Sequence, residues 1–205
     1  MLPEEYSLGM KRLLPILLLV FSVGVGAYDE DDLTKLKTTN QCLKCDLSQA
    51  RLTGAYLRGV KLAGANLTEA DLTGANFYRV NLTNADLTRA NLYKAHMEVV
   101  NLAGANLTGA NLIDAYMEDT NLREASLAGV DLTKAYMEAT ELTGANLTMA
   151  NLTSAFLEGI DLENADLTDA VLTDARLNWA KNLDKAILCR TIMPNGSVNN
   201  SNCSD

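Results

Sequence analysis

The sequence has very little of what most catalytic sites need. Its 205 residues include a single histidine, His96, and a single tryptophan. A catalytic triad or a histidine-based metal site needs further side chains that the sequence around His96 does not supply. No glycine-rich phosphate loop is present either, because the glycines of the central region fall at regularly spaced turn positions. We therefore expect no enzyme activity, no cofactor and no metal site.

Positive charge is also scarce. The chain has 17 Lys and Arg against 26 Asp and Glu, which gives a formal net charge of −9. Binding to nucleic acid needs a basic patch that neutralises phosphates, so a nucleic-acid partner is not expected. The acidity favours solubility and is compatible with a basic protein partner.

Long hydrophobic runs are limited to one stretch near the N-terminus, Leu13 to Val25. It follows two basic residues and is followed by small residues, which is typical of a secretory signal peptide over residues 1–27 with cleavage before Tyr28. An uncleaved membrane anchor is the alternative, but the run is shorter than a membrane span requires. We expect export and no stable membrane insertion after cleavage.

What the sequence does contain is a five-residue repeat. Every fifth residue from Leu47 to Leu177 is Leu, Phe or Met, and the residue two places earlier is usually Ala. At about 100° per residue these positions would scatter around a helix, so a helix is excluded. Each Ala-x-Leu unit is instead a short extended segment, and the next two residues turn the chain. The pattern predicts an all-β solenoid.

Residue size shows a second period of twenty. Larger residues replace Ala at Val60, Val80, Val100, Thr120, Thr140 and Ile160, one at every twentieth residue. Four five-residue units therefore make one coil. With coils about 4.8 Å apart, roughly seven coils would form a rod about 32 Å long.

Runs such as Ala65-Asn66-Leu67-Thr68 and Ala105-Asn106-Leu107-Thr108 resemble the A(D/N)LXX motif of the pentapeptide repeat proteins. The resemblance implies a right-handed quadrilateral β-helix. With its signal sequence and its cysteine-bearing tail, the chain is similar to exported cyanobacterial members of that family. This likeness implies a non-enzymatic structural or protein-interaction module in the thylakoid lumen or the periplasm.

The two ends of the repeat are expected to be capped. Residues 28–41 form an N-terminal cap with a short helix that buries Leu33 and Leu36, residues 42–180 form the repeat, and residues 181–205 form a C-terminal cap. The repeat slips by one residue near Lys181 and Asn182, then resumes at Leu183 and Leu188. Trp179, at this junction, is expected to plug the last coil. A monomer is expected because both ends are covered.

Four cysteines in an exported chain allow three pairings. Cys189 and Cys203 both follow the repeat, and we expect a disulfide between them. Cys42 and Cys45 fall on inward repeat positions, where core packing or a short structural disulfide would suit both. Their CxxC spacing would also fit a redox or metal role, but the usual context for either is missing.

One face of the solenoid has a distinctive surface. Just before the central residue it carries aromatic side chains, and just after it carries glutamates, each one coil apart. The aromatic set includes Tyr56, His96, Tyr116, Tyr136 and Phe156, and the acidic set is Glu98, Glu118, Glu138 and Glu158. Exposed aromatic side chains next to charges are typical of protein interfaces, so this face is the candidate interaction site for an unknown protein partner. The alternative is that the columns are only a product of repeat duplication.

Two further functions fit parts of the pattern. Some acidic relatives imitate duplex DNA and act on a DNA-binding enzyme such as gyrase, but that role needs a cytoplasmic protein. Ice or crystal-surface binding would use a column of threonines at every twentieth residue, and Ala128 interrupts that column.

Overall fold

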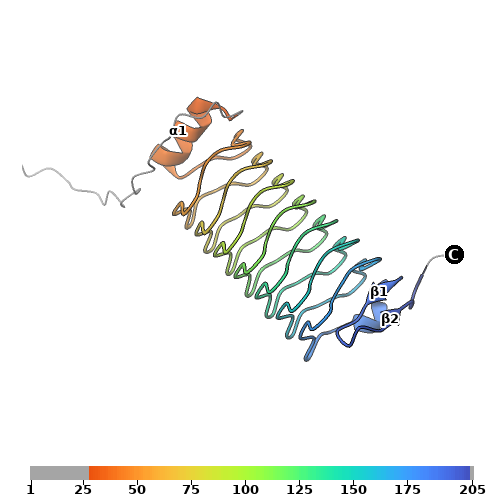
Figure 1. The fold of residues 1–205 in the computed structure, drawn as a ribbon. Coiled ribbons are helices and arrows are strands. Elements are labelled where there is room, and N and C mark those ends of the chain that lie inside the picture. The colour runs from red at the N-terminus through yellow and green to blue at the C-terminus, as the bar shows by residue number, and fades with distance from the viewer. Residues whose placement is uncertain (1–27, 204–205) are drawn as a thin grey trace, which may run out of the picture.

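The computed structural model describes residues 28–203, and the signal peptide predicted for residues 1–27 lies outside this range. The chain winds into a rod of stacked coils, with α1 (Glu30–Thr39) at one end and the strands β1 (Thr191–Ile192) and β2 (Val198–Asn199) at the other (Figure 1). No helix between residues 28 and 203 has the length and apolar character needed to cross a membrane.

The coils pair with one another through parallel β-bridges. Gln41 pairs with Lys61, and equivalent bridges continue every fifth residue to Asp161, which pairs with Lys181. Each bridge joins residues twenty positions apart, so the predicted coil of four five-residue units is confirmed. The residue before each central Leu, Phe or Met lies on the pairing edge, and its neighbours on both sides point into the core.

Each coil bends at four-residue turns closed by a backbone hydrogen bond. The amide of Ala50, for example, donates to the carbonyl of Leu47 over 3.1 Å. Every fifth residue from Lys44 to Trp179, the third of its turn, has a positive φ, such as +66° at Gly104. Glycine adopts this conformation without steric cost, which explains why so many of these positions are Gly.

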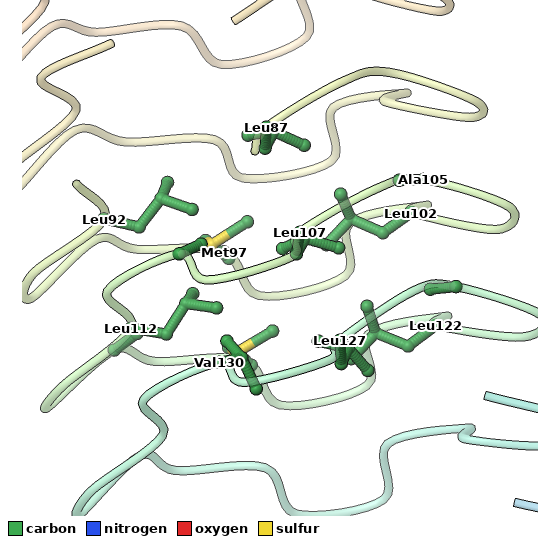
Figure 2. Packing of buried hydrophobic residues seen from close by; sticks show 14 of the residues in the cluster. Leu87, Leu92, Met97, Leu102, Ala105, Leu107, Leu112, Leu122, Leu127 and Val130 are labelled. Carbon is green, nitrogen blue, oxygen red and sulfur yellow. The ribbon is translucent and has the colours of Figure 1, made fainter. Parts of the chain in front are cut away.

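The interior is filled by the two inward positions of each unit. The central residues and their alanine-type partners are buried from Leu47 to Leu172. In Figure 2, Leu92 lies over Leu112 and Leu102 lies over Leu122, so identical side chains stack from one coil to the next. Stacking like on like fills the interior without large voids.

Helix α1 covers the first coil, as the sequence predicts. Asp29 caps its N-terminus, since its carboxylate accepts hydrogen bonds from the amides of Asp31 (2.8 Å) and Asp32 (3.1 Å). Leu33 and Leu36 are both buried against the leucine core. The helix therefore removes the open end of the core from water.

The C-terminal end is built differently from the coils. The pairing slips by one residue after Lys181, because Asp166 pairs with Ile187 and Val171 with Ile192. The extra residue is accommodated in the short 3-10 helix η1 (Leu183–Lys185), so Leu188 takes a buried repeat position and Leu183 does not. Strand β2 then returns antiparallel to β1.

Trp179 does not plug the last coil, and this expectation was wrong. Its side chain is 80% exposed. The residue is the third of its turn, with φ +57°, at a position whose side chains point away from the core along the whole rod. Leu177 and Leu183 pack partly buried against the core instead.

Candidate functional site

The candidate interaction face follows one edge of the rod. We call it the aromatic–acidic face: the column His96, Tyr116, Tyr136 and Phe156 together with the column Glu98, Glu118, Glu138 and Glu158. The first column lies on consecutive parallel bridges, which join each member to the next. The residues between the columns, Met97, Met117, Met137 and Leu157, point inward and are buried. The strand alternation thus directs both columns outward.

The four rings of this face form one continuous stack. Ring centres are 5.0 Å apart between His96 and Tyr116, 5.1 Å between Tyr116 and Tyr136, and 4.5 Å between Tyr136 and Phe156. The planes of each pair lie within 7° of parallel. The repeat of the coils therefore sets the spacing of the rings.

Two residues that the sequence analysis did not single out complete the face at its C-terminal end. The guanidinium carbon of Arg176 lies 4.7 Å from the centre of the Phe156 ring. The amide of Asn178 donates a hydrogen bond of 3.2 Å to Glu158. Both residues occupy the next coil at the same two repeat positions, so the twenty-residue period could have identified them.

The four glutamates differ in the groups that lie next to their carboxylates. Glu98 lies 3.5 Å from Nδ1 of His96, and Glu158 has the amide of Asn178. Glu118 and Glu138 are exposed, and no ion pair reaches either of them from elsewhere in residues 28–203. The middle of the face therefore carries two exposed carboxylates without an ion pair among these residues.

The N-terminal part of the same edge has the opposite sign. Two arginines contact the Tyr78 ring, with the guanidinium carbons of Arg58 and Arg79 at 4.4 and 5.2 Å from its centre. Tyr56 is exposed, and Asn76 separates it from the stacked rings. The aromatic–acidic face therefore begins at His96.

The other faces use their pairing edge for internal hydrogen bonds. The side-chain oxygen of Asn111 accepts from the amide of Ile113 over 3.1 Å, and its amide donates to Asn91 in the previous coil over 3.0 Å. Asp131 likewise accepts from Thr133 and Asn151. These polar columns satisfy one another and leave fewer groups for a partner than the aromatic–acidic face does.

Asp32, Cys42 and Cys45 form the cluster that most resembles a metal site, with one potential ligand atom of each within 4.8 Å. The two sulfurs, however, are joined in a disulfide with an S–S distance of 2.10 Å. The Asp32 carboxylate accepts a 2.8 Å hydrogen bond from the amide of Asp46. The bonded sulfurs offer no thiolate to a metal, and the group ties α1 to the first coil.

The second disulfide is the one expected from the sequence. Cys189 and Cys203 are bonded, with Cα atoms 4.8 Å apart. The bond joins the segment that follows β2 to the last half-coil, next to the ion pair of Arg190 with Asp169. It therefore fixes the C-terminal cap.

A small cavity in the core has an entirely aliphatic lining. It lies toward the C-terminal end of the rod, and its lining residues are Leu142, Leu147, Leu152, Leu157, Ile160, Leu162, Leu167 and Leu172. Binding of a polar substrate needs placed polar groups, and this lining has none.

Comparisons with known proteins agree with the repeat. A family model described as pentapeptide repeats matches in 8 copies, over residues 45–84, 81–119, 101–138, 110–148, 120–159 and 145–181. No curated protein matches the chain.

Three solved structures illustrate the similarity. HetL, a pentapeptide repeat protein involved in heterocyst differentiation regulation from Nostoc sp. strain PCC 7120, is 30% identical over 78% of each chain, with a TM-score of 0.40. Rfr23 from Cyanothece 51142 is 25% identical over 76% of this chain and 96% of its own, with a TM-score of 0.17. A trypsin-treated form of QnrB1, a plasmid-mediated fluoroquinolone resistance protein, is 22% identical over 69% and 79%, with a TM-score of 0.44. Of these comparisons, the family model is the one that assigns the chain to a family, because it matches over residues 45–181.

Proposed function

Because the chain belongs to the pentapeptide repeat family, we propose that it is a non-enzymatic structural and protein-interaction module. It folds as a right-handed quadrilateral β-helix, acts as a monomer and binds a protein partner through the aromatic–acidic face. It needs no cofactor, and nucleic acid is not its ligand.

The observation that carries this proposal is the composition of the aromatic–acidic face. Four stacked rings lie beside four glutamates, and the two middle glutamates have no counter-charge within the described part of the chain. Aromatic side chains bury much area at low cost in conformational entropy, and they dominate the binding energy of many interfaces. Charges at the edge of such a patch accelerate association with a partner of opposite sign.

We place the protein in an extracytoplasmic compartment, the thylakoid lumen or the periplasm. The two disulfides support this location, since such bonds persist in oxidising compartments and are rare in the cytosol. The signal peptide predicted from the sequence supports it too. Fractionation of the source organism, with an antibody against the chain, tests the location directly.

The test of the interaction is cross-linking in the organism from which the chain comes. The wild type, the face variant Tyr116→Ala with Tyr136→Ala, and a control variant are compared by affinity purification and mass spectrometry. The control is Tyr93→Ala with Ile113→Ala, which removes two large outward side chains from another face. We expect the wild type and the control to capture the same partner and the face variant to lose it.

The face variant needs a stability check, because it also breaks the ring stack. Aromatic pairs of this kind contribute about 0.5 to 1.5 kcal/mol each. The melting temperature and the circular dichroism of each variant therefore accompany the cross-linking. If a folded face variant captures the partner as well as the control does, the aromatic–acidic face is not the binding site.

The acidic DNA mimic is the second candidate, and the column of glutamates is the observation that favours it. Duplex DNA presents closely spaced negative charges along its axis. Arg58, Arg79 and Arg176 on the same edge weaken the imitation. A supercoiling assay with gyrase separates the two candidates, since inhibition that depends on Glu118 and Glu138 would favour the mimic.

A further inference from the structure

The spacing along the aromatic–acidic face matches one kind of secondary structure. Its rings follow one another at 5.0, 5.1 and 4.5 Å along the rod. Helix residues at i, i+3, i+7 and i+10 share one side and lie at about 0, 4.5, 10.5 and 15 Å along the helix axis. Residues on one side of an extended strand recur only about every 6.7 Å, so within two coils they no longer lie opposite successive rings. A helix laid along the rod can thus meet four successive coils.

The last coil next to the aromatic–acidic face shows which chemical groups bind to its rings and carboxylates. There a guanidinium, that of Arg176, lies on the end of the ring stack, and a donor, Asn178, bonds to the last glutamate. Glu138 and Glu118 lie one and two coils further from this end than Glu158, and neither has such a donor among residues 28–203. Their carboxylates repel each other because they are separated by only one coil spacing. A partner that brings cationic donors to these two positions would remove that repulsion.

A second copy of this chain is the competing occupant. The same edge carries Arg58 and Arg79 at its N-terminal end, so an antiparallel copy could place these arginines opposite the glutamates. The glutamates outnumber these two arginines, however, and both arginines already stack on Tyr78 within their own chain. Charge complementarity therefore favours a partner that is basic along its whole length.

We propose that the partner segment is a basic amphipathic α-helix that lies along the rod. Its Lys or Arg side chains at i, i+3, i+7 and i+10 meet the carboxylates of Glu98, Glu118, Glu138 and Glu158. Its adjacent apolar stripe covers the exposed edges of the stacked rings. This inference rests on the proposed function, because it names what the same face binds.

The test is a fluorescence anisotropy titration of the disulfide-bonded protein with two synthetic 18-residue peptides. Both peptides have the same Lys, Leu and Ala content and blocked termini. One places Lys at i, i+3, i+7 and i+10, and the other places the same Lys residues at i, i+2, i+4 and i+6. We expect the first peptide to bind about tenfold more tightly at low salt, and the difference to shrink as salt screens the charges.

Matched variants locate the binding. Glu118→Gln with Glu138→Gln removes two charges from the face, and Glu124→Gln with Asp174→Asn removes two exposed charges from other faces. We expect the first pair of changes to weaken the helical peptide about fivefold or more and the second pair to change its affinity less than about twofold.

Each alternative has its own outcome. Equal binding of the two peptides, equal effects of the two variants, or no binding would overturn the helix proposal. So would self-association in sedimentation that the Glu118 and Glu138 changes abolish, because the occupant would then be a second copy. If the peptides fail while Tyr116→Ala with Tyr136→Ala still loses the cross-linked partner, the interaction function stands and only the helix is wrong.

Discussion

The hydroxyl of Thr120 donates a 2.7 Å hydrogen bond to the carbonyl oxygen of Met97, inside an otherwise aliphatic core. Thr140 makes the same bond to Met117 over 2.9 Å, and Thr191 makes it to Leu167 over 2.7 Å. Alanine-type positions therefore lie within reach of a carbonyl of the preceding coil. This explains how a core of Leu and Ala accepts threonine, since each buried hydroxyl has its acceptor.

Thr120→Val should lower the free energy of unfolding by about 1 to 3 kcal/mol, because it leaves the Met97 carbonyl without its hydroxyl donor. Val100→Thr, one coil earlier in the same column, should be nearly neutral, because the new hydroxyl can reach the equivalent carbonyl of Phe77. Urea denaturation of both variants measures the effects. A large loss in Val100→Thr would show that the Thr120 geometry is not general.

Leu112→Ala should cost about 2 to 5 kcal/mol, because it leaves a cavity between stacked leucines. Leu112 is fully buried. Thr148→Ala is the control, since the Thr148 side chain points outward and should contribute less than about 0.5 kcal/mol. Chemical denaturation of the two variants makes the comparison. Similar destabilisation of both would contradict the inward and outward assignment.

Mass spectrometry of non-reduced peptides should recover Cys42 bonded to Cys45 and Cys189 bonded to Cys203. Replacing Cys189 and Cys203 by Ser should remove about 3 kcal/mol from the stability of the C-terminal cap. Stability is distributed along such a stack, so hydrogen exchange should accelerate near β1 and β2 and hardly change near Leu112. Uniform acceleration along the rod would contradict this local role.

Acid should loosen the same cap through Asp169. The Nε of Arg190 donates to its carboxylate over 2.6 Å, and this hydrogen bond holds the pKa of Asp169 below its ordinary value of 3.8. The pKa of Asp169 is therefore lower in the folded state than in the unfolded state. Its interaction with Arg190 stabilises the cap fully above pH 3.8, and this stabilisation is lost as the pH falls through the folded pKa.

The measurement is amide exchange of Leu188 and Ile192 as a function of pH, in the wild type and in Asp169→Asn. In the wild type, these two amides should lose protection as the pH falls below 3.8, the ordinary pKa of the Asp169 carboxyl. The variant should start with less protection and lose less of it. Identical pH profiles would show that Asp169 does not hold the cap.

Much of this structure follows from the period of the sequence. Apolar residues at alternating intervals of two and three exclude a helix, and the recurrence of larger residues at Val60, Val80 and Val100 sets four units per coil. The structure has the twenty-residue pairing and the inward positions that this pattern predicts. The columns of the aromatic–acidic face follow for the same reason, because stacked coils bring every twentieth side chain together.

The ends and the pairings of individual side chains were decided by the tertiary structure. The CxxC spacing left the state of Cys42 and Cys45 open, and the structure bonds them beneath α1. Trp179 was expected inside and lies outside, because its turn position outweighs its hydrophobicity. Arg176 on the end of the ring stack and Arg58 on Tyr78 depend on where the long side chains fold back.

The physical reason for this division is the range of the interactions involved. Inside the repeat, each side chain packs against the residues at the same position of the neighbouring coils. The five-residue pattern and the translation from one coil to the next therefore determine the packing. At the ends no copy follows, and residues 181–203 must bury the last leucines with contacts that no period encodes. The sequence by itself therefore determined the coil and its columns, and the tertiary structure decided how the rod ends and which charges its surface leaves unpaired.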